Sequence, residues 1–459
     1  MENKAREFVV TEPSVIYQTS LFAEYKRPFQ IFKKDRNGDK EFNFRELCPE
    51  IPNTTYLTHA IHSYPAKFIP QIPYYVIKNL TQPEEYVLDP FSGSGTALVE
   101  ASLLGRHSYG VDIDPLGQLI TEVKTTPLNV SLHEFTKLIE TFKASIKNYK
   151  GTPLLVDFPN KDYWFEKKVQ EDLGIVLAAL EELKPEISEP IYKFFKVCVS
   201  SIIRKVANAD PKISKPFISK YMRRAIENGR RDLDTFKYLE EALADYSRRI
   251  LDYSHHIKEI ELYTSIRPKA VMLKNSDARS IGLDDEAVNL IVTSPPYANA
   301  QEYLRSIKLE LFWLGMATNS KLLDLKKQLI GTESVPAKEY AKLERFGIPD
   351  LDRTLEKIYE VDQRRSYIVY KYFVDMKKNI EEDYRVLKPS GHFCILVGDN
   401  VIRKVPLYTH RYIVDIAEDA AFKTIEVGYD RIKSRGLSPK RHHTAGLIEV
   451  EWLMVFKKT

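Results

Sequence analysis

The sequence predicts an α/β protein with an open, mainly parallel sheet that is interrupted by a large helical insertion. Residues 87–114 have the pattern of a strand, a glycine turn, a helix and a second strand with an acidic end. Residues 130–262 are rich in Glu, Lys and Leu and show apolar residues at helical spacing. The chain after residue 268 alternates apolar runs with helical segments and finishes in two strands, which is expected of a sheet with a terminal antiparallel hairpin.

The turn after the first of these strands is suited to the close approach of a ligand. It reads Asp-Pro-Phe-Ser-Gly-Ser-Gly-Thr (residues 89–96), and Gly93 and Gly95 leave the backbone uncovered. The turn lacks the third glycine of a dinucleotide site and the Gly-Lys-Ser/Thr of a Walker loop. Asp112, at the end of the second strand, stands where ribose hydroxyls bind. The pattern therefore favours a nucleoside without phosphates, commonly S-adenosylmethionine, and a tight turn with no ligand is the alternative.

A second motif, Thr-Ser-Pro-Pro-Tyr at residues 293–297, follows another apolar strand. Prolines cannot continue a sheet ladder, so the chain leaves the sheet with a fixed backbone shape. This shape presents the Ser294 hydroxyl and the Pro295 carbonyl as acceptors beside the ring of Tyr297. An ordinary proline-rich exit from a strand is the alternative, and the glycine turn in the same chain favours a functional role.

Together these stretches resemble motifs I and IV of the DNA amino-methyltransferases, which transfer a methyl group from S-adenosylmethionine to cytosine N4 or adenine N6. The stretch His-Ser-Tyr-Pro-Ala-Lys-Phe-Ile-Pro (residues 62–70) resembles their motif X, which packs beside the cofactor. The order X, I, IV makes the match specific, and it covers residues 55–125 and the chain from residue 268 onward. The resemblance implies a Rossmann-like methyltransferase sheet.

The resemblance also implies roles for individual residues. Ser294 and Pro295 would accept the hydrogens of the target amine, Pro296 would stiffen the turn, and Tyr297 would stack on a base that is flipped out of the duplex. Asp277 is at the motif III position, where the family holds the adenine amino group, although a local cap of the loop is a close alternative. The expected cofactor-binding residues are Tyr64, Phe68, Pro70, Asp89, Phe91, Ser92, Gly93, Gly95, Thr96, Asp112 and Asp277. For Phe68, a place in the core explains its spacing equally well.

The target base is predicted from the first residue of motif IV. Ser at position 294 resembles the cytosine-N4 members, and adenine N6 remains the alternative. Cytosine-C5 chemistry is excluded because no cysteine follows a proline, as the nucleophile of that reaction would require. An RNA amino-methyltransferase is less favoured, since residues 1–55 do not resemble an RNA-binding module. A non-catalytic partner subunit is also less favoured, because the motifs are intact.

Four regions follow from these patterns. They are an N-terminal arm (1–55), the first part of the methyltransferase domain (56–128), an inserted helical domain (129–265) and the second part of the methyltransferase domain (266–459). The helical domain is the candidate for DNA recognition, although its position before motif III departs from the usual layouts. A charged insertion at 318–362 is either a mobile flap over DNA or a surface elaboration.

Basic residues gather at two places in the sequence. Residues 200–224 interleave basic, hydroxyl and aromatic side chains, which suits contacts with phosphates. The loop between the last two strands, residues 431–443, is also strongly basic, and a solvated surface is the alternative at both places. The expected DNA-binding residues are Arg204, Lys205, Lys212, Lys215, Arg223, Arg224, Arg435, Lys440 and Arg441.

Composition sets further limits. Contents of 43% hydrophobic and 29% charged residues are those of a soluble globular protein, and a net charge of +4 does not by itself require nucleic acid. No apolar run has membrane-spanning length and the N-terminus does not resemble a signal peptide, so we expect a cytoplasmic protein. The expected partners are double-stranded DNA and, in a restriction-modification system, a cognate endonuclease, with a monomer and a dimer both open.

No metal site is expected. The three cysteines are scattered, which excludes a Cys-x-x-Cys zinc site. Residues 35–46 have acidic and amide side chains at some positions of a calcium-binding loop, but Lys40 replaces the glycine that makes its sharp turn. A solvated charged turn is therefore the favoured interpretation of that stretch.

Overall fold

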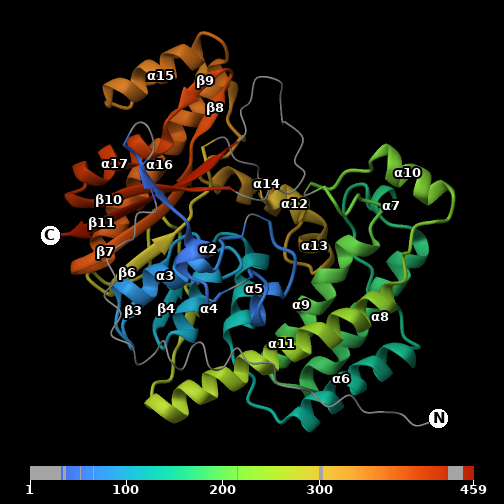
Figure 1. Ribbon diagram of the computed structural model, residues 1–459. Helices are drawn as coiled ribbons and strands as arrows, with labels where there is room; N and C mark the ends of the chain where they lie inside the picture. The colour runs from blue at the N-terminus through green and yellow to red at the C-terminus, as the bar shows by residue number, and fades with distance from the viewer. Residues whose placement is uncertain are drawn as a thin grey trace.

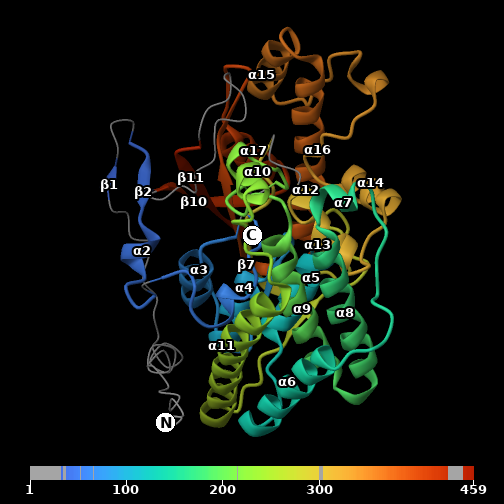
Figure 2. The same ribbon diagram turned by 90° about the vertical axis from the view of Figure 1, so that its right-hand side faces the viewer.

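The computed structural model describes residues 33–34, 38–51, 53–65, 67–213, 215–298, 303–432 and 448–459. Among these residues, nine strands form one central sheet, with helices on both of its faces (Figure 1). Figure 2 shows the same arrangement from the side, with helices α6, α8 and α11 below and beside the sheet. No helix in the described ranges is long and apolar enough to cross a lipid bilayer.

The central sheet has the strand order β1-β2-β10-β11-β7-β6-β3-β4-β5. The strands from β7 to β5 pair in parallel, whereas β11 lies antiparallel between β7 and β10. The strand bounds are β1 Lys33–Lys34, β2 Lys40–Phe42, β3 Tyr86–Asp89, β4 His107–Gly110, β5 Ala270–Met272, β6 Val288–Thr293, β7 Leu387–Gly398, β10 Phe422–Arg431 and β11 Val450–Lys458. The predicted α/β class, with its terminal antiparallel hairpin, is confirmed.

Alternating side chains divide the core into two layers, one on each face of the sheet. Val87 and Leu88 are neighbours in β3, yet each is buried in a different cluster, because successive side chains of a strand point to opposite faces. Helices α3 (Gln71–Leu80), α4 (Thr96–Leu103) and α5 (Pro115–Thr125) contribute to the cluster of Val87. Helices α15 (Pro349–Tyr359), α16 (Gln363–Val386) and α17 (Thr409–Asp419) contribute to the cluster of Leu88.

The chain leaves the sheet after β4 and returns to it at β5. Most of the residues between these strands form helices, which Figure 1 shows to the right of the sheet and below it. After α5 they are α6 Leu132–Lys147, α7 Lys161–Trp164, α8 Lys167–Leu183, α9 Glu189–Val206, α10 Lys220–Glu227 and α11 Thr235–Thr264, with the short η2 at Lys184–Glu186. Ser131 and Glu134 form a reciprocal capping box that starts α6. We propose that these helices are the inserted domain predicted for residues 129–265.

The inserted helices share their core with the sheet. Helix α9 contacts α5, and α11 contacts the 3-10 helix η1 (Leu57–Ala60). One hydrophobic cluster accordingly runs from β6, through Leu290 and Val292, to Phe195 of α9 and Ile250 of α11. Burial of this apolar surface is the main force that holds the helices against the sheet.

Several short elements, most of them after β6, complete the fold. They are α12 Tyr303–Ser306, α13 Lys308–Trp313, α14 Asn319–Gln328 and η3 Ala337–Tyr340, with α2 Phe44–Leu47 near the N-terminus. A hairpin of β8 (Asn400–Ile402) and β9 (Val405–Leu407) contacts α15, and both lie at the top of Figure 1. The sequence pattern did not predict this hairpin, because strands of three residues carry no readable period.

Candidate active site

A pocket lies at the carboxyl ends of the central parallel strands. Four of the segments in its wall directly follow strands of the sheet: the glycine turn after β3, the loop after β4, the loop after β5 and the proline turn after β6. Open α/β sheets bind their ligands at this edge. The predicted site residues in the wall are Tyr64, Phe91, Gly93, Asp112, Asp277, Ser294 and Pro296.

The glycine turn needs its glycines for two different reasons. Gly93 and Gly95 have φ angles of +51° and +78°, which residues with a Cβ rarely adopt. A Cβ on Gly95 would lie 2.6 Å from the Cγ2 atom of Thr121, so helix α5 packs directly on the turn. Gly93 faces the pocket instead, and its amide donates a 2.7 Å hydrogen bond to Oδ2 of Asp112. The turn is thereby joined to the carboxylate that follows β4.

Two carboxyl groups lie side by side after β4. Oδ1 of Asp112 accepts from the amide of Asp114 at 2.8 Å, and the Tyr64 hydroxyl donates to Oδ2 of Asp114 at 2.6 Å. Burial raises the pKa of Asp112; burial and the neighbouring Asp112 charge raise the pKa of Asp114 to about 7. Asp114 was not among the predicted site residues, because an Asp-Pro pair before a helical pattern is typical of a residue that only caps the N-terminus of a helix. It does cap α5, by accepting from the amide of Leu116 at 3.0 Å.

Several predicted cofactor residues support the wall from behind. Asp89 is buried, and its Oδ1 accepts from the Thr293 hydroxyl at 2.6 Å and from the amide of Phe91 at 3.1 Å. Burial raises the pKa of Asp89 to about 7. The Ser92 hydroxyl donates to the carbonyl of Val111 at 3.2 Å. Asp89 therefore links the glycine turn to the strand that carries the proline turn.

The remaining predicted cofactor residues begin helices or pack in the core. Thr96 is the first residue of α4, and Pro70 is the N-cap of α3; both are buried. Phe68 is partly buried and packs against the core cluster on the α3 side of the sheet. None of these three residues lines the pocket in the described structure.

The proline turn is held on two sides. Ser294 and Pro296 face the pocket, whereas Pro295 is buried. The Tyr297 hydroxyl donates a 2.6 Å hydrogen bond to Oε1 of Glu451 in β11, and burial raises the pKa of that glutamate. A Cβ on Gly398 would come within 2.9 Å of the Tyr297 ring, so the ring lies directly against the end of β7.

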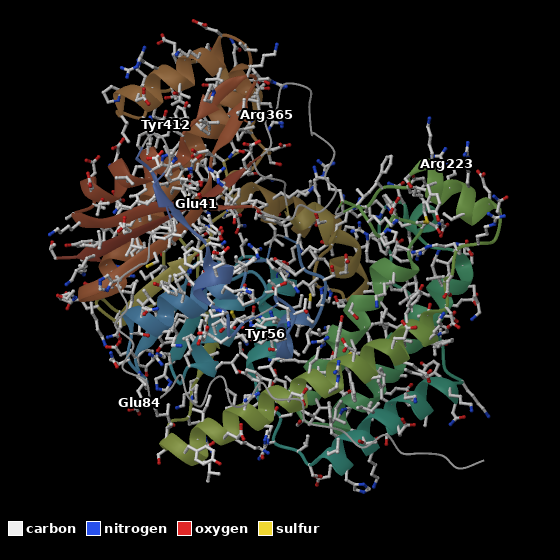
Figure 3. The ribbon with its side chains drawn as sticks, in the orientation of Figure 1. Glu41, Tyr56, Glu84, Arg223, Arg365 and Tyr412 are labelled. Carbon is white, nitrogen blue, oxygen red and sulfur yellow. The ribbon has the colours of Figure 1, made fainter. Side chains whose placement is uncertain are left out.

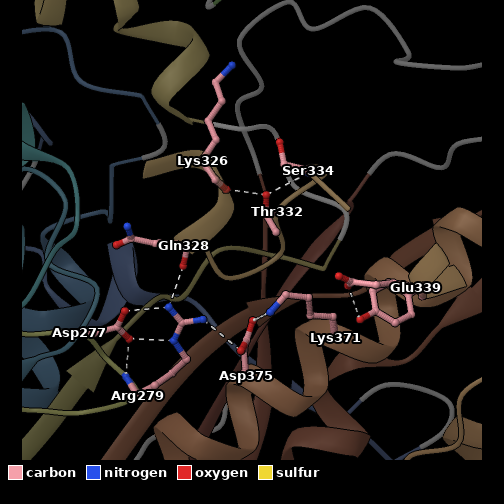
Figure 4. A network of polar contacts seen from close by, with 10 residues as sticks. Asp277, Arg279, Lys326, Gln328, Thr332, Ser334, Glu339, Lys371 and Asp375 are labelled. Atoms are coloured by element: carbon pink, nitrogen blue, oxygen red, sulfur yellow. Dashed lines mark hydrogen bonds and ion pairs between the residues drawn. The ribbon is translucent and has the colours of Figure 1, made fainter. Parts of the chain in front are cut away.

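Asp277 lies in the pocket wall and is bound by an arginine that the sequence did not indicate. Nε and Nη2 of Arg279 donate to its two carboxylate oxygens at 2.9 and 2.7 Å (Figure 4). Burial acts to raise the pKa of Asp277, but the hydrogen bonds and charge of Arg279 outweigh it and hold that pKa below its usual value. Arg279 also lines the pocket, as do Gln328 and Ile330 of the charged insertion at residues 318–362.

The predicted DNA-binding residues have different surroundings. Arg223 and Arg224 are exposed on α10, and Figure 3 shows Arg223 pointing away from the rest of the molecule. Lys212 is also exposed, and Nζ of Lys205 lies 5.6 Å from the ring centre of Tyr238.

Two further predicted DNA contacts are less exposed. Arg204 is partly buried and donates to the carbonyl oxygens of Ser306, at 2.8 Å, and Ile213, so it holds the chain together rather than projecting with Arg223. Lys215 is partly buried. The other predicted contacts, Arg435, Lys440 and Arg441, lie outside the described residues.

The side chains suited to metal ions are dispersed. Within the described ranges, no three His, Cys, Asp or Glu side chains are grouped so that they could hold a metal ion. Cys48, Cys198 and Cys394 are buried and unpaired, and burial raises the pKa of each thiol.

Comparison with known proteins adds independent information. A family model described as DNA methylase matches residues 11–118. The chain is 28% identical over 414 residues to the Type II methyltransferase M.MvaI of Kocuria varians, covering 85% of this chain and 88% of that protein. It is 22% identical over 458 residues to the Type II methyltransferase M.MjaII of Methanocaldococcus jannaschii, covering 80% and 81%. The Type II methyltransferase M.AvaI of a Nostoc species is 25% identical over 372 residues, covering 75% and 73%.

Solved structures resemble the chain more distantly. A methyltransferase from Methanosarcina mazei, described as S-adenosylmethionine-dependent, aligns with 86% of this chain and 98% of its own at 9% identity and a TM-score of 0.30. A DNA modification methylase from Thermus thermophilus, described as putative and complexed with S-adenosylmethionine, aligns with 40% and 53% at 17% identity and a TM-score of 0.21. These scores are too low to carry an argument about the site.

Proposed function

We propose that the chain is an S-adenosylmethionine-dependent amino-methyltransferase of DNA and that it methylates cytosine N4 at a specific site in duplex DNA. The observation that carries the proposal is the shared pocket wall, in which Gly93 and Asp112 lie together with Ser294 of the proline turn. A methyl donor and a methyl acceptor need adjacent sites of this kind. As a Type II enzyme, it would protect DNA against a cognate endonuclease in a restriction-modification system.

The wall has the groups that a nucleoside cofactor requires. The carboxylate of Asp112 accepts from the amides of Gly93 and Asp114 and lines the pocket, where it would also accept from ribose hydroxyls. Gly93 leaves open the space that a side chain would fill, and Oδ2 of Asp277 has capacity for one more donor beside Arg279, such as an adenine amino group. The bound cofactor supplies a methyl group on a sulfonium centre, which is already a strong electrophile.

The proline turn supplies the second half of the chemistry. The lone pair of an exocyclic amine is delocalised into its ring, and acceptors for both amine hydrogens would localise it. Ser294 Oγ and the Pro295 carbonyl are proposed as these acceptors, and Tyr297 as the residue that stacks on the flipped base. The amine nitrogen would bond to the methyl carbon as the carbon–sulfur bond breaks, the sulfur would keep the electron pair of that bond, and the surplus amine proton would pass to solvent. Most of the acceleration would come from alignment of the two reactants.

Cytosine is proposed as the target because Ser294 begins the motif. Asp or Asn at this position is more typical of the adenine-N6 members. Adenine N6 remains the alternative, since both bases present an amine on an amidine-like ring and the same acceptors serve both.

The exposed tip around α10 is proposed to contact DNA. Arg223, Arg224 and Lys212 are exposed there, and so are the rings of Phe217 and Tyr221, at 55% and 76%. Basic groups suit phosphates, and exposed aromatic rings suit base or sugar contacts. The inserted helices would then read the target sequence while the sheet carries out the chemistry.

Transfer of a tritiated methyl group to unmethylated double-stranded DNA tests the function directly. We expect N4-methylcytosine after nucleoside digestion and mass spectrometry. Ser294→Ala should lower kcat by roughly 10- to 100-fold, because it removes one hydrogen bond to the reacting amine. Tyr297→Ala should also lower activity strongly, whereas Tyr297→Phe keeps the ring and loses the bonds of its hydroxyl to Glu451 and Ser294, so it should retain more activity than Tyr297→Ala.

Each other product would change the proposal in its own way. N6-methyladenine would keep the site and replace the base. Label in RNA and none in DNA would overturn the DNA assignment. No transfer by a chain that still binds the cofactor would overturn the catalytic assignment and favour a non-catalytic subunit. Equal activity in Ser294→Ala and the unmodified chain would remove Ser294 from the reaction.

A further inference from the structure

Part of the pocket wall comes from the charged insertion at residues 318–362, which contains none of the recognised motifs. Gln328 is the last residue of α14, Leu329 and Ile330 follow it, and all three line the pocket. Gly331, with φ of +75°, continues this stretch, and a Cβ on it would lie 4.0 Å from the carbonyl oxygen of Tyr297. Residues 328–331, here called the wall segment, therefore adjoin both the cofactor pocket and the proline turn.

Arg279 joins the wall segment to the opposite side of the pocket. Its Nη2 donates to the carbonyl of Gln328 at 2.7 Å as well as to Asp277. Its Nη1 forms a 3.1 Å ion pair with Asp375 of α16, whose carboxylate is 5% exposed and also binds Lys371 at 2.9 Å. Figure 4 shows the guanidinium between these three partners. One planar group thus connects the loop after β5, the insertion and helix α16.

The far end of the wall segment is anchored separately. The Thr332 hydroxyl donates to the carbonyl of Lys326 at 2.5 Å and accepts from the amide of Ser334 at 3.1 Å. Glu333 forms a 2.8 Å ion pair with Arg365 of α16. The wall segment is accordingly a short span that is fixed at Gln328 by Arg279 and, just beyond its other end, at Glu333 by Arg365.

We propose that Arg279 is a positioning residue that holds Asp277 and the wall segment in register, so that the cofactor pocket has its binding shape. This rests on the proposed function of the same pocket. The role needs a planar group with several N–H donors in fixed directions, because Asp277, Asp375 and the Gln328 carbonyl lie in three directions around the guanidinium. A lysine keeps the charge but offers a single compact ammonium group, which cannot replace these contacts together.

Binding of S-adenosylhomocysteine without DNA, measured by isothermal titration calorimetry, tests the proposal. Arg279→Lys should weaken binding about tenfold or more, the scale of losing a charge-assisted hydrogen bond.

Arg385→Lys is the matched control. Arg385 also holds a carboxylate with two nitrogens, at Glu382, forms an ion pair with Asp285 at 2.8 Å, and donates to the carbonyls of Ile281 and Leu283, yet it does not line the pocket. Its loss should leave affinity within twofold.

The thermal unfolding midpoint of each variant shows whether the comparison is fair. If Arg279→Lys does not fold, Asp375→Asn takes its place: it frees one side of the guanidinium and should weaken binding by a smaller factor. Unchanged affinity in the folded Arg279 variant, or equal losses in both arginine variants, would overturn the proposal. An unmodified chain that binds no S-adenosylhomocysteine would also overturn it. Normal binding without DNA methylation would instead contradict the proposed function alone.

Discussion

At the scale of single residues, Asp89 shows how one buried carboxyl group can connect two motifs. It accepts from Thr293 of β6 and from Phe91 of the glycine turn, and it is 3% exposed. Asp383 of α16 is also buried, and burial together with the charges of Glu382 and Asp89 raises its pKa. For both carboxyl groups, the protonated form is therefore favoured more strongly in the folded chain than it is in water.

This environment predicts a pH dependence of stability. Asp89 ionises near pH 4 in the unfolded chain and at about 7 in the folded one, so between these values the folded state binds more protons. The free energy of unfolding should fall as pH rises through this range, by at most about 1.4 kcal/mol per pH unit from this group, and the contribution should be constant above it. Asp89→Asn removes the titration and keeps an acceptor for Thr293.

Urea unfolding at pH 5, 6, 7 and 8 measures this effect. The variant should gain stability relative to the unmodified chain as pH rises from 5 to 7. Asp114 and Glu310, whose pKa values burial also raises to about 7, remain in both proteins and cancel in the difference. Parallel pH profiles of the two proteins would show that Asp89 is already ionised in the folded state.

The site residues that the sequence could predict are those fixed by their immediate neighbours. Gly93 and Ser294 belong to turns whose shape is set by adjacent glycines and prolines, and Asp112 follows a strand of readable pattern. Arg279 had no such signal, because its partner carbonyl in Gln328 is 49 residues away in the sequence.

At the scale of elements, long periodic helices could be predicted and short contacts between distant segments could not. Apolar spacing indicated α6, α8, α9 and α11, because each buries one face along many turns. The parallel pairing of β2 with β10, which aligns Lys40 with Gly428, had no sequence signal. It depends on the absence of a side chain at Gly428, where a Cβ would meet the Phe42 ring at 2.1 Å.

Helix α10 supports a prediction at this scale. Replacing Arg223 and Arg224 together by Ala should weaken DNA binding at all sequences, because fewer phosphates would be neutralised. The slope of log K against log salt should fall by about one for each phosphate that an arginine no longer pairs with. Fluorescence anisotropy of labelled duplex DNA over a salt series measures both quantities.

Arg267 provides the control for this experiment. It follows the opposite end of α11, its side chain is 72% exposed, and it pairs with Glu261. Arg267→Ala should leave the slope unchanged. A normal slope in the α10 double variant would mean that this tip does not contact the backbone of DNA.

At the scale of the whole molecule, the shared core predicts one cooperative unfolding transition. Trp164 and Trp313 are buried in the cluster that joins the inserted helices to the sheet, and Trp452 is buried in the cluster on the other face. These are the three tryptophans of the chain. Because β6 contributes to both clusters, loss of either should remove the support of the other.

Local tryptophan reporters can test this cooperativity. Trp452→Phe leaves the two reporters of the first cluster, and the double variant Trp164→Phe/Trp313→Phe leaves the reporter of the second. In each variant, the urea midpoints from fluorescence and from far-UV circular dichroism should coincide. An earlier fluorescence transition in Trp452→Phe alone would indicate that the inserted helices unfold as a separate unit.

The strand order also determines when the sheet can form during synthesis. Strand β3 pairs with β6, and the contact between Tyr86 and Asn289 spans 203 residues. Strand β11, which separates β7 from β10, is made last. On the ribosome, β3 therefore has one unpaired edge throughout the synthesis of the inserted helices. Unpaired edges attract other strands, so this nascent edge is where chains on neighbouring ribosomes would first associate wrongly.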